Sequence, residues 1–400
     1  MKRLVRHPFT LLLVALLAQL AIAYWGAHDE KFHPMGDVTY AYQPWVDYML
    51  REGKWLGLNA PWVYPFPALV PLFVAKLISP GDYLFGWLTL AICLNQLALG
   101  WLALKVSGGV RLGWYWLATT IALGPVALSR LDGISVALAL LGFSAIARGY
   151  IANSALWLSA SAWVKVWPAA ILANIAINQA WRRHLLVPTA IFSGSILIVG
   201  VLLGGNANLF SFITQQSARG LQLESVVATP WVWNSAFNEA SSIYYDTSFL
   251  TFQVQGPLAS ETAAAMTWWM LLALAVCMAL LLVASWRNHD SFQLLAIGSL
   301  LLTLVLIVFN KVGSPQYLGW LIFPVLLGLH ARVSHWWPAW LGVLIATALT
   351  QWAYPFSYES LIEAEVWAVA LLTVRNALEV ALLAWVFWRL LWLVFKKQTK

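Results

Sequence analysis

The sequence is poor in charge. Only 10% of its 400 residues are charged and 61% are hydrophobic, whereas a soluble domain carries about 25% charged residues. Several apolar runs reach or approach the roughly 20 residues that cross a bilayer as a helix. These proportions exclude an ordinary soluble protein. Because lipid cannot satisfy open backbone groups, we expect an all-α polytopic membrane protein.

Cysteine is scarce as well. The two cysteines, Cys93 and Cys277, both lie inside apolar runs, which excludes a disulfide framework and a cysteine-based metal site. We expect no metal and no cofactor. Repeats of fixed period and low-complexity stretches are absent, as are basic polar segments with interleaved aromatics. The net charge of +7 therefore indicates cytoplasmic anchoring rather than nucleic-acid binding.

Apolar runs and aromatic residues are abundant. The 26 Trp and 13 Tyr suit helix ends at a membrane interface. Residues 66–79 are apolar but crowded by prolines, which favours a re-entrant or interfacial segment. The remaining runs predict twelve transmembrane helices, at about 8–26, 83–105, 113–128, 133–150, 153–165, 167–180, 185–203, 266–286, 292–309, 316–330, 338–353 and 366–395.

The distribution of charge predicts an orientation. Twelve crossings place both termini on one side, and MKRLVRH and KKQTK mark that side as cytoplasmic by the positive-inside rule. Of the 16 acids, all except Asp290 and Glu379 then fall on the outer side. The chain is thus expected to be a single membrane domain, 1–400, in the plasma membrane. Its long outer loops are 27–82 and 204–265. The inner loops carry Lys105, Arg111, Arg148, Arg182, Arg183, Arg287 and Arg332.

The N-terminus has features of a cleavable signal peptide: a basic start, an apolar run and then Ala21-Ile22-Ala23. We expect an uncleaved signal anchor, and in either case the loop that follows lies outside.

Asp37 lies in the first outer loop, shortly after the first predicted span. Val38, Tyr42, Trp45 and Met49 follow at helical spacing, which predicts an amphipathic helix along the membrane surface. Pro44 is tolerated near the start of such a helix, and Gly53 would end it. Asp37 is either a functional carboxylate or the N-cap of this helix.

Three further stretches place charge beside apolar runs. SRLDGIS, 129–135, puts Arg130 and Asp132 in a short outer turn, where they form either a functional site or a helix-end ion pair with Asp132 as the cap. WVKVWP, 163–168, puts Lys165 at membrane depth. A charge there costs about 2.5–3.5 kcal/mol, so Lys165 is a functional candidate unless it extends to the interface.

The second long loop and a later turn add more candidates. SARGLQLES, 217–225, carries Arg219, Gln222 and Glu224; alternatively, Arg219 and Glu224 lie on a solvated helix. FNKVGSPQYLGW, 309–320, forms a tight outer turn through Gly313 and Pro315. Its polar or aromatic candidates are Lys311, Ser314, Gln316 and Tyr317.

Four cations therefore come from four separate outer positions: Arg130, Lys165, Arg219 and Lys311. We expect them to converge on an anion at the outer membrane surface. A lipid-linked phosphate fits best, because its charge needs Arg or Lys and its tail needs an apolar wall. Aromatic side chains such as Tyr64 either line the substrate cavity or form an ordinary interface belt.

Several of these stretches, in this order, resemble the GT-C glycosyltransferases, and most closely the polyprenol-phosphate-mannose-dependent α-mannosyltransferases of the DUF2029 or glycosyltransferase 87 group. The stretches are GDVTYAY, YPFP, SRLDGISVALALL, WVKVWP, RGLQLES and NKVGSPQYL. The proline element departs from the family pattern, because Val63 stands where an acidic residue often precedes Tyr-Pro-Pro.

The resemblance implies a GT-C-like fold and an inverting sugar transfer from a polyprenyl phosphate, with Asp37 as catalytic base. It implies that Arg130, Lys165, Arg219 and Lys311 bind the donor phosphate. The expected acceptor is a glycolipid or a cell-envelope glycan, and mannose is the leading sugar, ahead of arabinofuranose and glucose. Substrate-binding candidates are Asp132, Gln222, Glu224, Ser314, Gln316, Tyr317 and Tyr64.

Two other classes stay open. A secondary transporter also places charges inside a helical bundle, although the internal repeats common among transporters are not visible here. A lipid-binding or flipping protein would need the phosphate site but not Asp37.

Overall fold

A computed structural model describes residues 6–215, 219–237, 240–287 and 291–395. Asp290, most of MKRLVRH, the terminal KKQTK and the first two residues of SARGLQLES lie outside the described residues. Two compact units, Met1–Gln216 and Ser217–Lys400, divide the chain by its internal contacts. The prediction of one membrane domain over 1–400 stays a prediction.

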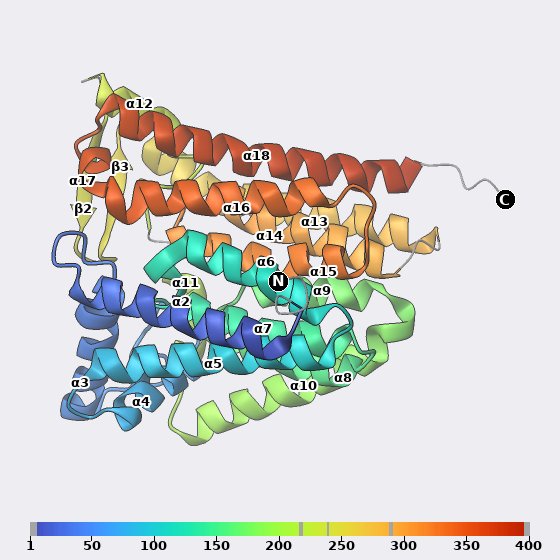
Figure 1. Cartoon of the computed structure of the whole chain (residues 1–400). Coiled ribbons are helices and arrows are strands. Elements are labelled where there is room, and N and C mark those ends of the chain that lie inside the picture. Colours follow the sequence, from blue (N-terminus) through green and yellow to red (C-terminus); the bar gives the residue numbers. More distant parts are fainter. Residues whose placement is uncertain (1–5, 216–218, 238–239, 288–290, 396–400) are drawn as a thin grey trace. The chain divides into compact units, whose positions relative to one another are not determined.

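Helices form the first unit (Figure 1). Helix α5 packs against α2, α4, α6 and α7, and α7 packs along α8, which in turn contacts α10. The bounds are α2 Pro8–His28, α3 Gln43–Glu52, α4 Leu69–Ile78, α5 Tyr83–Lys105, α6 Gly109–Leu123, α7 Leu131–Ile146, α8 Ile151–Val164, α9 Pro168–Ile177, α10 Gln179–Leu202 and α11 Ser211–Thr214.

The predicted helix after Asp37 is confirmed. A π-helical turn, Val38–Tyr42, leads into α3, which has Pro44 in its first turn. Helix α3 ends at Gly53, whose positive φ of 66° suits a residue without Cβ. Val38, Tyr42 and Met49 are buried in a cluster with residues of α4 and α5. The apolar face of this helix therefore packs on protein, and its place along the membrane surface stays a prediction.

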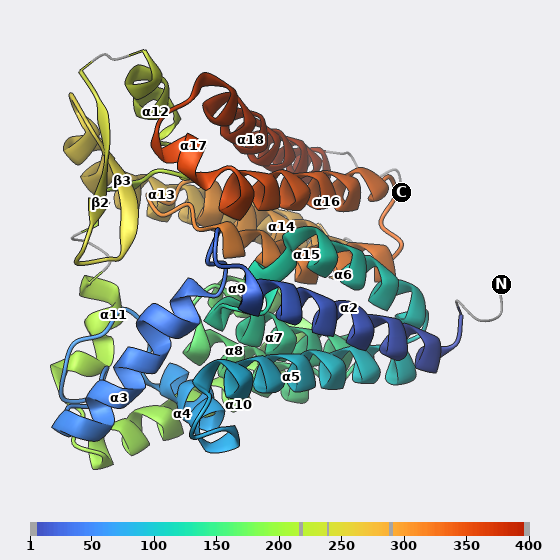
Figure 2. The same cartoon turned by 60° about the vertical axis from the view of Figure 1, so that its left-hand side comes forward.

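The second unit combines helices with a small sheet. Three antiparallel strands lie in the order β1-β3-β2, and Leu221 pairs with Val254 while Tyr244 pairs with Gln253. Figure 2 shows β2 and β3 beside α12 and α17. The bounds are β1 Leu221–Gln222, α12 Thr229–Ala236, β2 Ser242–Asp246, β3 Thr251–Gln255, α13 Ala259–Trp286, α14 Ser291–Val308, α15 Ile322–His330, α16 Trp337–Gln351, α17 Tyr358–Ile362 and α18 Val366–Phe395.

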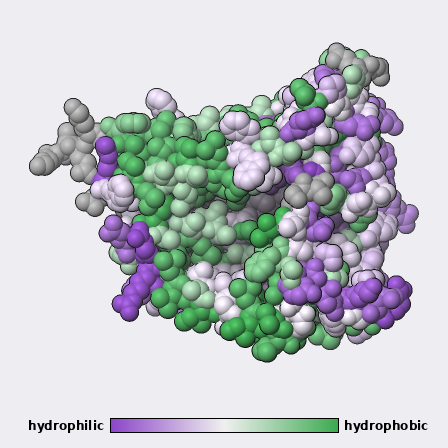
Figure 3. Space-filling view, turned by 180° about the vertical axis from the view of Figure 1, so that it is seen from behind, coloured by the Kyte–Doolittle hydropathy of each residue, from purple (hydrophilic) through white to green (hydrophobic). Residues whose placement is uncertain are grey.

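Among the described residues, six helices are long and apolar enough to cross a membrane: α2, α5, α10, α13, α14 and α18. Hydrophobic residues cover large parts of the surface in Figure 3. On α10, for example, Ile191, Ile198 and Leu202 are all exposed. Such exposure is expected of lipid-facing helices and not of soluble ones. These six helices indicate a multi-pass membrane protein.

The prediction of a polytopic membrane protein is confirmed, whereas its number of twelve spans stays a prediction. Each predicted run contains a helix, but several of these helices have 9–16 residues, as in α6, α7, α8 and α15. The run at 316–330 starts as a 3₁₀ turn, Pro315–Leu321, before α15. A helix forms despite the prolines at 65–71: a 3₁₀ turn at Phe66–Ala68 leads into α4. The all-α expectation holds for the bulk of the chain, and the three-strand sheet is an addition to it.

Candidate functional site

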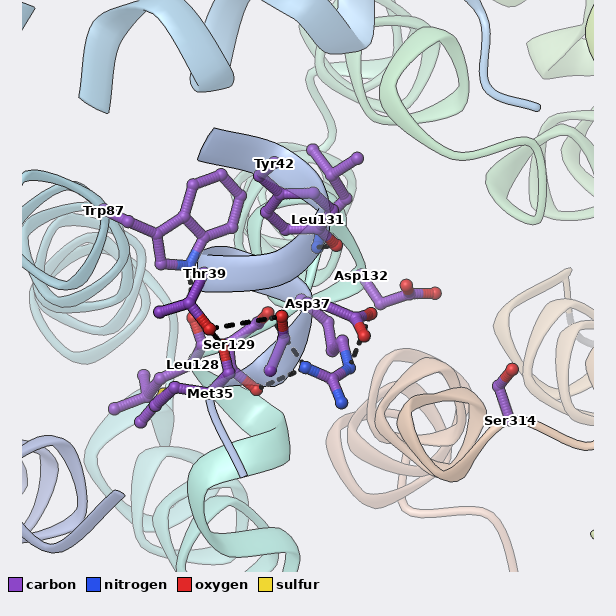
Figure 4. Close-up of polar contacts among 12 residues, drawn as sticks. Met35, Asp37, Thr39, Tyr42, Trp87, Leu128, Ser129, Leu131, Asp132 and Ser314 are labelled. Carbon is purple, nitrogen blue, oxygen red and sulfur yellow. Dashed lines mark hydrogen bonds and ion pairs between the residues drawn. The ribbon is translucent and has the colours of Figure 1, made fainter. Parts of the chain in front are cut away.

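An ion pair joins Asp37 to Arg130 in the first unit. The Nε atom of Arg130 lies 2.9 Å from Oδ2 of Asp37, as Figure 4 shows. The Arg130 side chain is 5% exposed, whereas that of Asp37 is 40% exposed. Asp37 makes no side-chain cap hydrogen bond to the turn that follows it. The N-cap alternative is therefore wrong, and the carboxylate is held by a buried guanidinium while it stays reachable from outside the protein.

Neighbouring contacts fix Arg130. Its Nη1 donates to Oγ of Ser129 at 3.1 Å. On one side of this segment, Nε1 of Trp87 donates to the carbonyl of Leu128 at 2.8 Å. On the other side, the backbone N–H of Leu131 donates to the hydroxyl of Tyr42 at 3.1 Å (Figure 4). The start of α7 is thus tied both to α5 and to the turn that carries Asp37.

Tyr42 shows how closely the polar groups gather. Burial raises the pKa of its hydroxyl well above 10, and the nearby Tyr64 and Asp37 raise the pKa further. Arg130 opposes this rise. Asp37, Arg130 and Tyr64 therefore all act on one hydroxyl group, that of Tyr42.

A second ion pair lies in the same unit. Nζ of Lys165 is 3.1 Å from Oδ2 of Asp132, and both side chains are largely buried. The Lys165 ammonium also lies over the ring of Tyr64, 4.6 Å from its centroid. Lys165 is thus held within the unit rather than extended toward the surface. Asp132 pairs with Lys165, and the N-cap of α7 is Arg130, so the expected capping role of Asp132 is wrong.

Hydrogen bonds of serine hydroxyls stabilise the interruption between α8 and α9, where Lys165 lies. Helix α8 ends at Val164 and α9 begins at Pro168. The hydroxyls of Ser135 and Ser161 are 2.8 Å apart, and Nε1 of Trp167 donates to Oγ of Ser135 at 3.0 Å. Ser135 lies one turn after Asp132 on α7. These bonds therefore attach the segment between α8 and α9 to the face of α7 that carries Asp132.

In the second unit, the segment 219–225 is a strand and a turn, not a solvated helix. The backbone N–H of Gln222 donates to the carbonyl of Lys311 at 2.9 Å, and the hydroxyl of Ser314 donates to Oε1 of Gln222 at 3.3 Å. A Cβ on Gly313 would lie 2.3 Å from backbone atoms of Ser225. Only glycine permits this approach, so the 311–314 turn packs directly on the backbone of residues 222–225.

Two cations lie near each other at this place. Lys311 is buried, and burial followed by the charge of Arg219 lowers the pKa of its ammonium below 10.5. The guanidinium of Arg219 lies 4.8 Å from the ring centroid of Phe249. Gln316 and Tyr317 are also buried, and Tyr317 stacks on Trp320. Like charges in a buried setting favour an anion between them.

Glu224 is buried beneath this turn. Its Oε1 accepts a hydrogen bond from the hydroxyl of Tyr358 at 2.8 Å, and burial raises the pKa of its carboxyl. Its backbone carbonyl accepts from Nη2 of Arg375 at 2.9 Å. Sequence reasoning missed Tyr358 and Arg375. The available signal was Arg375 with Glu379, an ion pair spaced i,i+4 within an apolar helix.

The candidates therefore gather as two groups, each inside one unit. The first-unit group is Asp37, Tyr64, Arg130, Asp132 and Lys165. The second-unit group is Arg219, Gln222, Glu224, Lys311, Ser314, Gln316 and Tyr317. The convergence of all four cations on one phosphate stays a prediction.

Each group is suited to anionic or hydroxylic ligands. The first offers a reachable carboxylate paired with Arg130 and a second cation, Lys165, in the same unit, which suits proton abstraction and a negative leaving group. The second offers two cations with hydroxyl and amide donors, which suits a phosphate. Within the part of the chain that the structure describes, no three His, Cys, Asp or Glu side chains gather as metal ligands. Neither a protein-family model nor a curated protein sequence matches this chain.

Proposed function

We propose that this protein is an integral membrane glycosyltransferase. It moves a sugar, with mannose as the first candidate, from a polyprenyl phosphate to a glycolipid or cell-envelope glycan on the extracytoplasmic face. The multi-pass character and the ordered resemblance to GT-C enzymes support this class. The resemblance alone supports the choice of sugar and the expectation of an α-mannosidic product from a β-linked donor.

The observation that carries the proposal is the unequal exposure of the Asp37–Arg130 pair. In the Lys165–Asp132 and Arg375–Glu379 pairs, by contrast, both side chains are largely buried. In the Asp37–Arg130 pair the cation is buried and the carboxylate is 40% exposed, which is what a general base needs to reach an acceptor hydroxyl. The guanidinium orients the carboxylate from the protein side.

The reaction would be a single displacement. Asp37 accepts the proton of the acceptor hydroxyl while the oxygen of that hydroxyl attacks the anomeric carbon of the donor sugar. The bond between that carbon and the phosphate oxygen breaks, and the lipid phosphate leaves with the electron pair. Cations stabilise the charge that the phosphate gains. A retaining mechanism needs a nucleophilic carboxylate in addition to the acid/base residue. Asp132, two residues from Arg130, is instead engaged with Lys165.

A transfer assay tests this function. Purified protein receives synthetic polyprenyl-phosphate mannose, arabinose and glucose, each with a panel of glycolipid and glycan acceptors, and products are identified by mass spectrometry. We expect product from one donor class and inversion at its anomeric carbon. Folded protein that makes no product from any of these donors would contradict the proposal.

A secondary transporter for an anionic lipid-linked substrate is the second candidate, and one observation favours it. Helix α8 stops and α9 restarts around Lys165, which faces the buried Asp132. Interrupted helices with charge at the break are characteristic of transporters. Uptake or flipping of labelled polyprenyl phosphate in proteoliposomes, unaffected by Asp37→Asn and without any transfer product, would select this alternative.

A further inference from the structure

Helix α18 carries a polar group that the proposed mechanism does not use. Arg375, Asn376 and Glu379 are all nearly fully buried within this 30-residue apolar helix. Ionisable residues inside such helices are costly and mark functional positions by default. Their partners in the structure therefore indicate what they do.

These partners are consecutive backbone carbonyls of one turn. Nη1 of Arg375 donates to Glu379 at 2.8 Å within the helix, while Nη2 reaches out to the carbonyl of Glu224 at 2.9 Å. Nδ2 of Asn376 donates to the carbonyl of Ser225 at 3.4 Å and to Oγ1 of Thr229 at 2.9 Å. Helix α18 thus holds the 224–225 peptides from one side.

The opposite side of the same turn carries the candidate anion site. Gly313 packs on the backbone of Ser225, and the Gln222 N–H is bonded to the carbonyl of Lys311. Ser314 is bonded to the side chain of Gln222. A displacement of residues 222–225 would therefore displace Lys311 and Ser314 with them.

We propose that Arg375 is a positioning residue for anion binding: from α18 it fixes the 222–225 turn and, through that turn, Lys311, Ser314 and the nearby Arg219. This inference rests on the proposed function, because the anion is taken to be the phosphate of the lipid-linked donor. Arg375 itself touches Glu224 and Glu379, so it acts on the ligand through the turn.

The geometry separates this role from simple stabilisation. Replacing a buried ion pair by apolar side chains of similar size often preserves stability. If Arg375 and Glu379 only fill the core, Arg375→Met with Glu379→Leu would keep both the fold and the ligand affinity. If Arg375 positions the turn, the double variant keeps the fold and loses affinity.

The experiment measures binding of a short-chain polyprenyl phosphate to the full-length protein in detergent, together with KM and kcat of transfer. The variants are R375M/E379L and R375K, and the matched control is Arg389→Met on the same helix, whose guanidinium bonds the carbonyl of His335. We expect the Kd and donor KM of R375M/E379L to rise about tenfold or more, the scale of a lost charged hydrogen bond, with a smaller change in kcat. R389M should bind as the wild type does.

R375K keeps the charge opposite Glu379 but lacks the fork that binds the carboxylate and the carbonyl together. R375K should therefore also bind the lipid phosphate more weakly while the protein stays folded, and this variant tests the inference if the double variant does not fold. Wild-type affinity in a folded R375K or R375M/E379L protein would overturn the inference alone. Failure of the wild-type protein to bind the lipid phosphate would overturn the proposed function and the inference together.

Discussion

At the scale of single residues, the acidic side chains of the two candidate groups differ in their exposure and in their partners. Asp37 is bound to a buried arginine yet stays accessible, while Asp132 is buried against Lys165. Glu224 is buried and accepts from a tyrosine. A carboxyl group is therefore suited to proton abstraction, to ion pairing or to structural hydrogen bonding, according to its surroundings.

Asp37→Asn should abolish transfer and leave donor binding intact. The amide keeps the size of the side chain but cannot accept the acceptor's proton, so kcat should fall by about 10²–10⁴. Radiolabelled sugar transfer and polyprenyl-phosphate binding measure the two properties separately. Asp47→Asn is the matched control, because Asp47 is a half-exposed acid of the neighbouring helix paired with Lys76. Equal activity of the Asp37 variant and the wild type would remove the base assignment.

Glu224 predicts a pH dependence of stability. Its folded-state pKa is raised above 4.5, chiefly by burial, so the folded protein favours the neutral carboxyl. Its contribution to stability is full below the ordinary pKa and is lost as pH rises through the raised value. In Glu224→Gln this component should be absent, which makes the unfolding free energy flatter with rising pH. Denaturant unfolding at a series of pH values tests it, with the exposed Glu261→Gln as the control; parallel pH profiles for wild type and E224Q would refute it.

At the scale of elements, short-range patterns and long-range contacts differ in how far the sequence reveals them. The helix ending at Gly53 and the helices in the apolar runs follow from spacing and from turn residues. Strands β2 and β3 were missed, since five-residue alternating stretches inside a polar loop give a weak signal.

The partners of the site residues depend on helix packing. Lys165 meets Asp132 because α8 lies along α7, and no local pattern contains that information. Both residues were predicted as candidates from the energetic cost and position of their charges. Their pairing was not predicted, and an ion pair between Arg130 and Asp132 was one of the two alternatives for that stretch, whereas Arg130 pairs with Asp37.

Gly313 gives a prediction about the 311–314 turn. A Cβ at this position would meet the backbone of Ser225 and Glu224 at 2.3–2.4 Å, where no flexible side chain can give way. Gly313→Ala should destabilise the protein by about 1–3 kcal/mol and weaken phosphate binding. Gly194→Ala on α10 is the control, because nothing lies within 4 Å of its added Cβ and alanine favours a helix by about 0.5–1 kcal/mol. Thermal unfolding and binding would show it, and a Gly313 variant as stable as wild type would count against the packing described here.

At the scale of the whole molecule, six long apolar helices among the described residues indicate the multi-pass character, and the distribution of charge predicts the orientation. We predict that residue 30 faces outside and residue 107, between α5 and α6, faces the cytoplasm. Glu30→Cys and Ser107→Cys, both exposed positions, would be made in a background where Cys93 and Cys277 are replaced.

A membrane-impermeant maleimide added to intact cells should label position 30 and should label position 107 only after the membrane is opened. Labelling of position 107 from outside, or protection of position 30, would reverse the predicted topology and place Asp37 on the wrong side for an extracytoplasmic acceptor.

The length of α18 has a consequence for the lipid around the protein. Thirty residues at 1.5 Å per residue give about 45 Å of helix, against a hydrocarbon core of about 30 Å. Such a helix tilts, or extends past the acyl region, by an amount that changes with bilayer thickness. Since Arg375 lies about a third of the way along α18, acyl-chain length would set the depth and inclination of the residue that holds the 222–225 turn. The lipid composition of the host membrane would then tune the affinity of a site made entirely of protein groups.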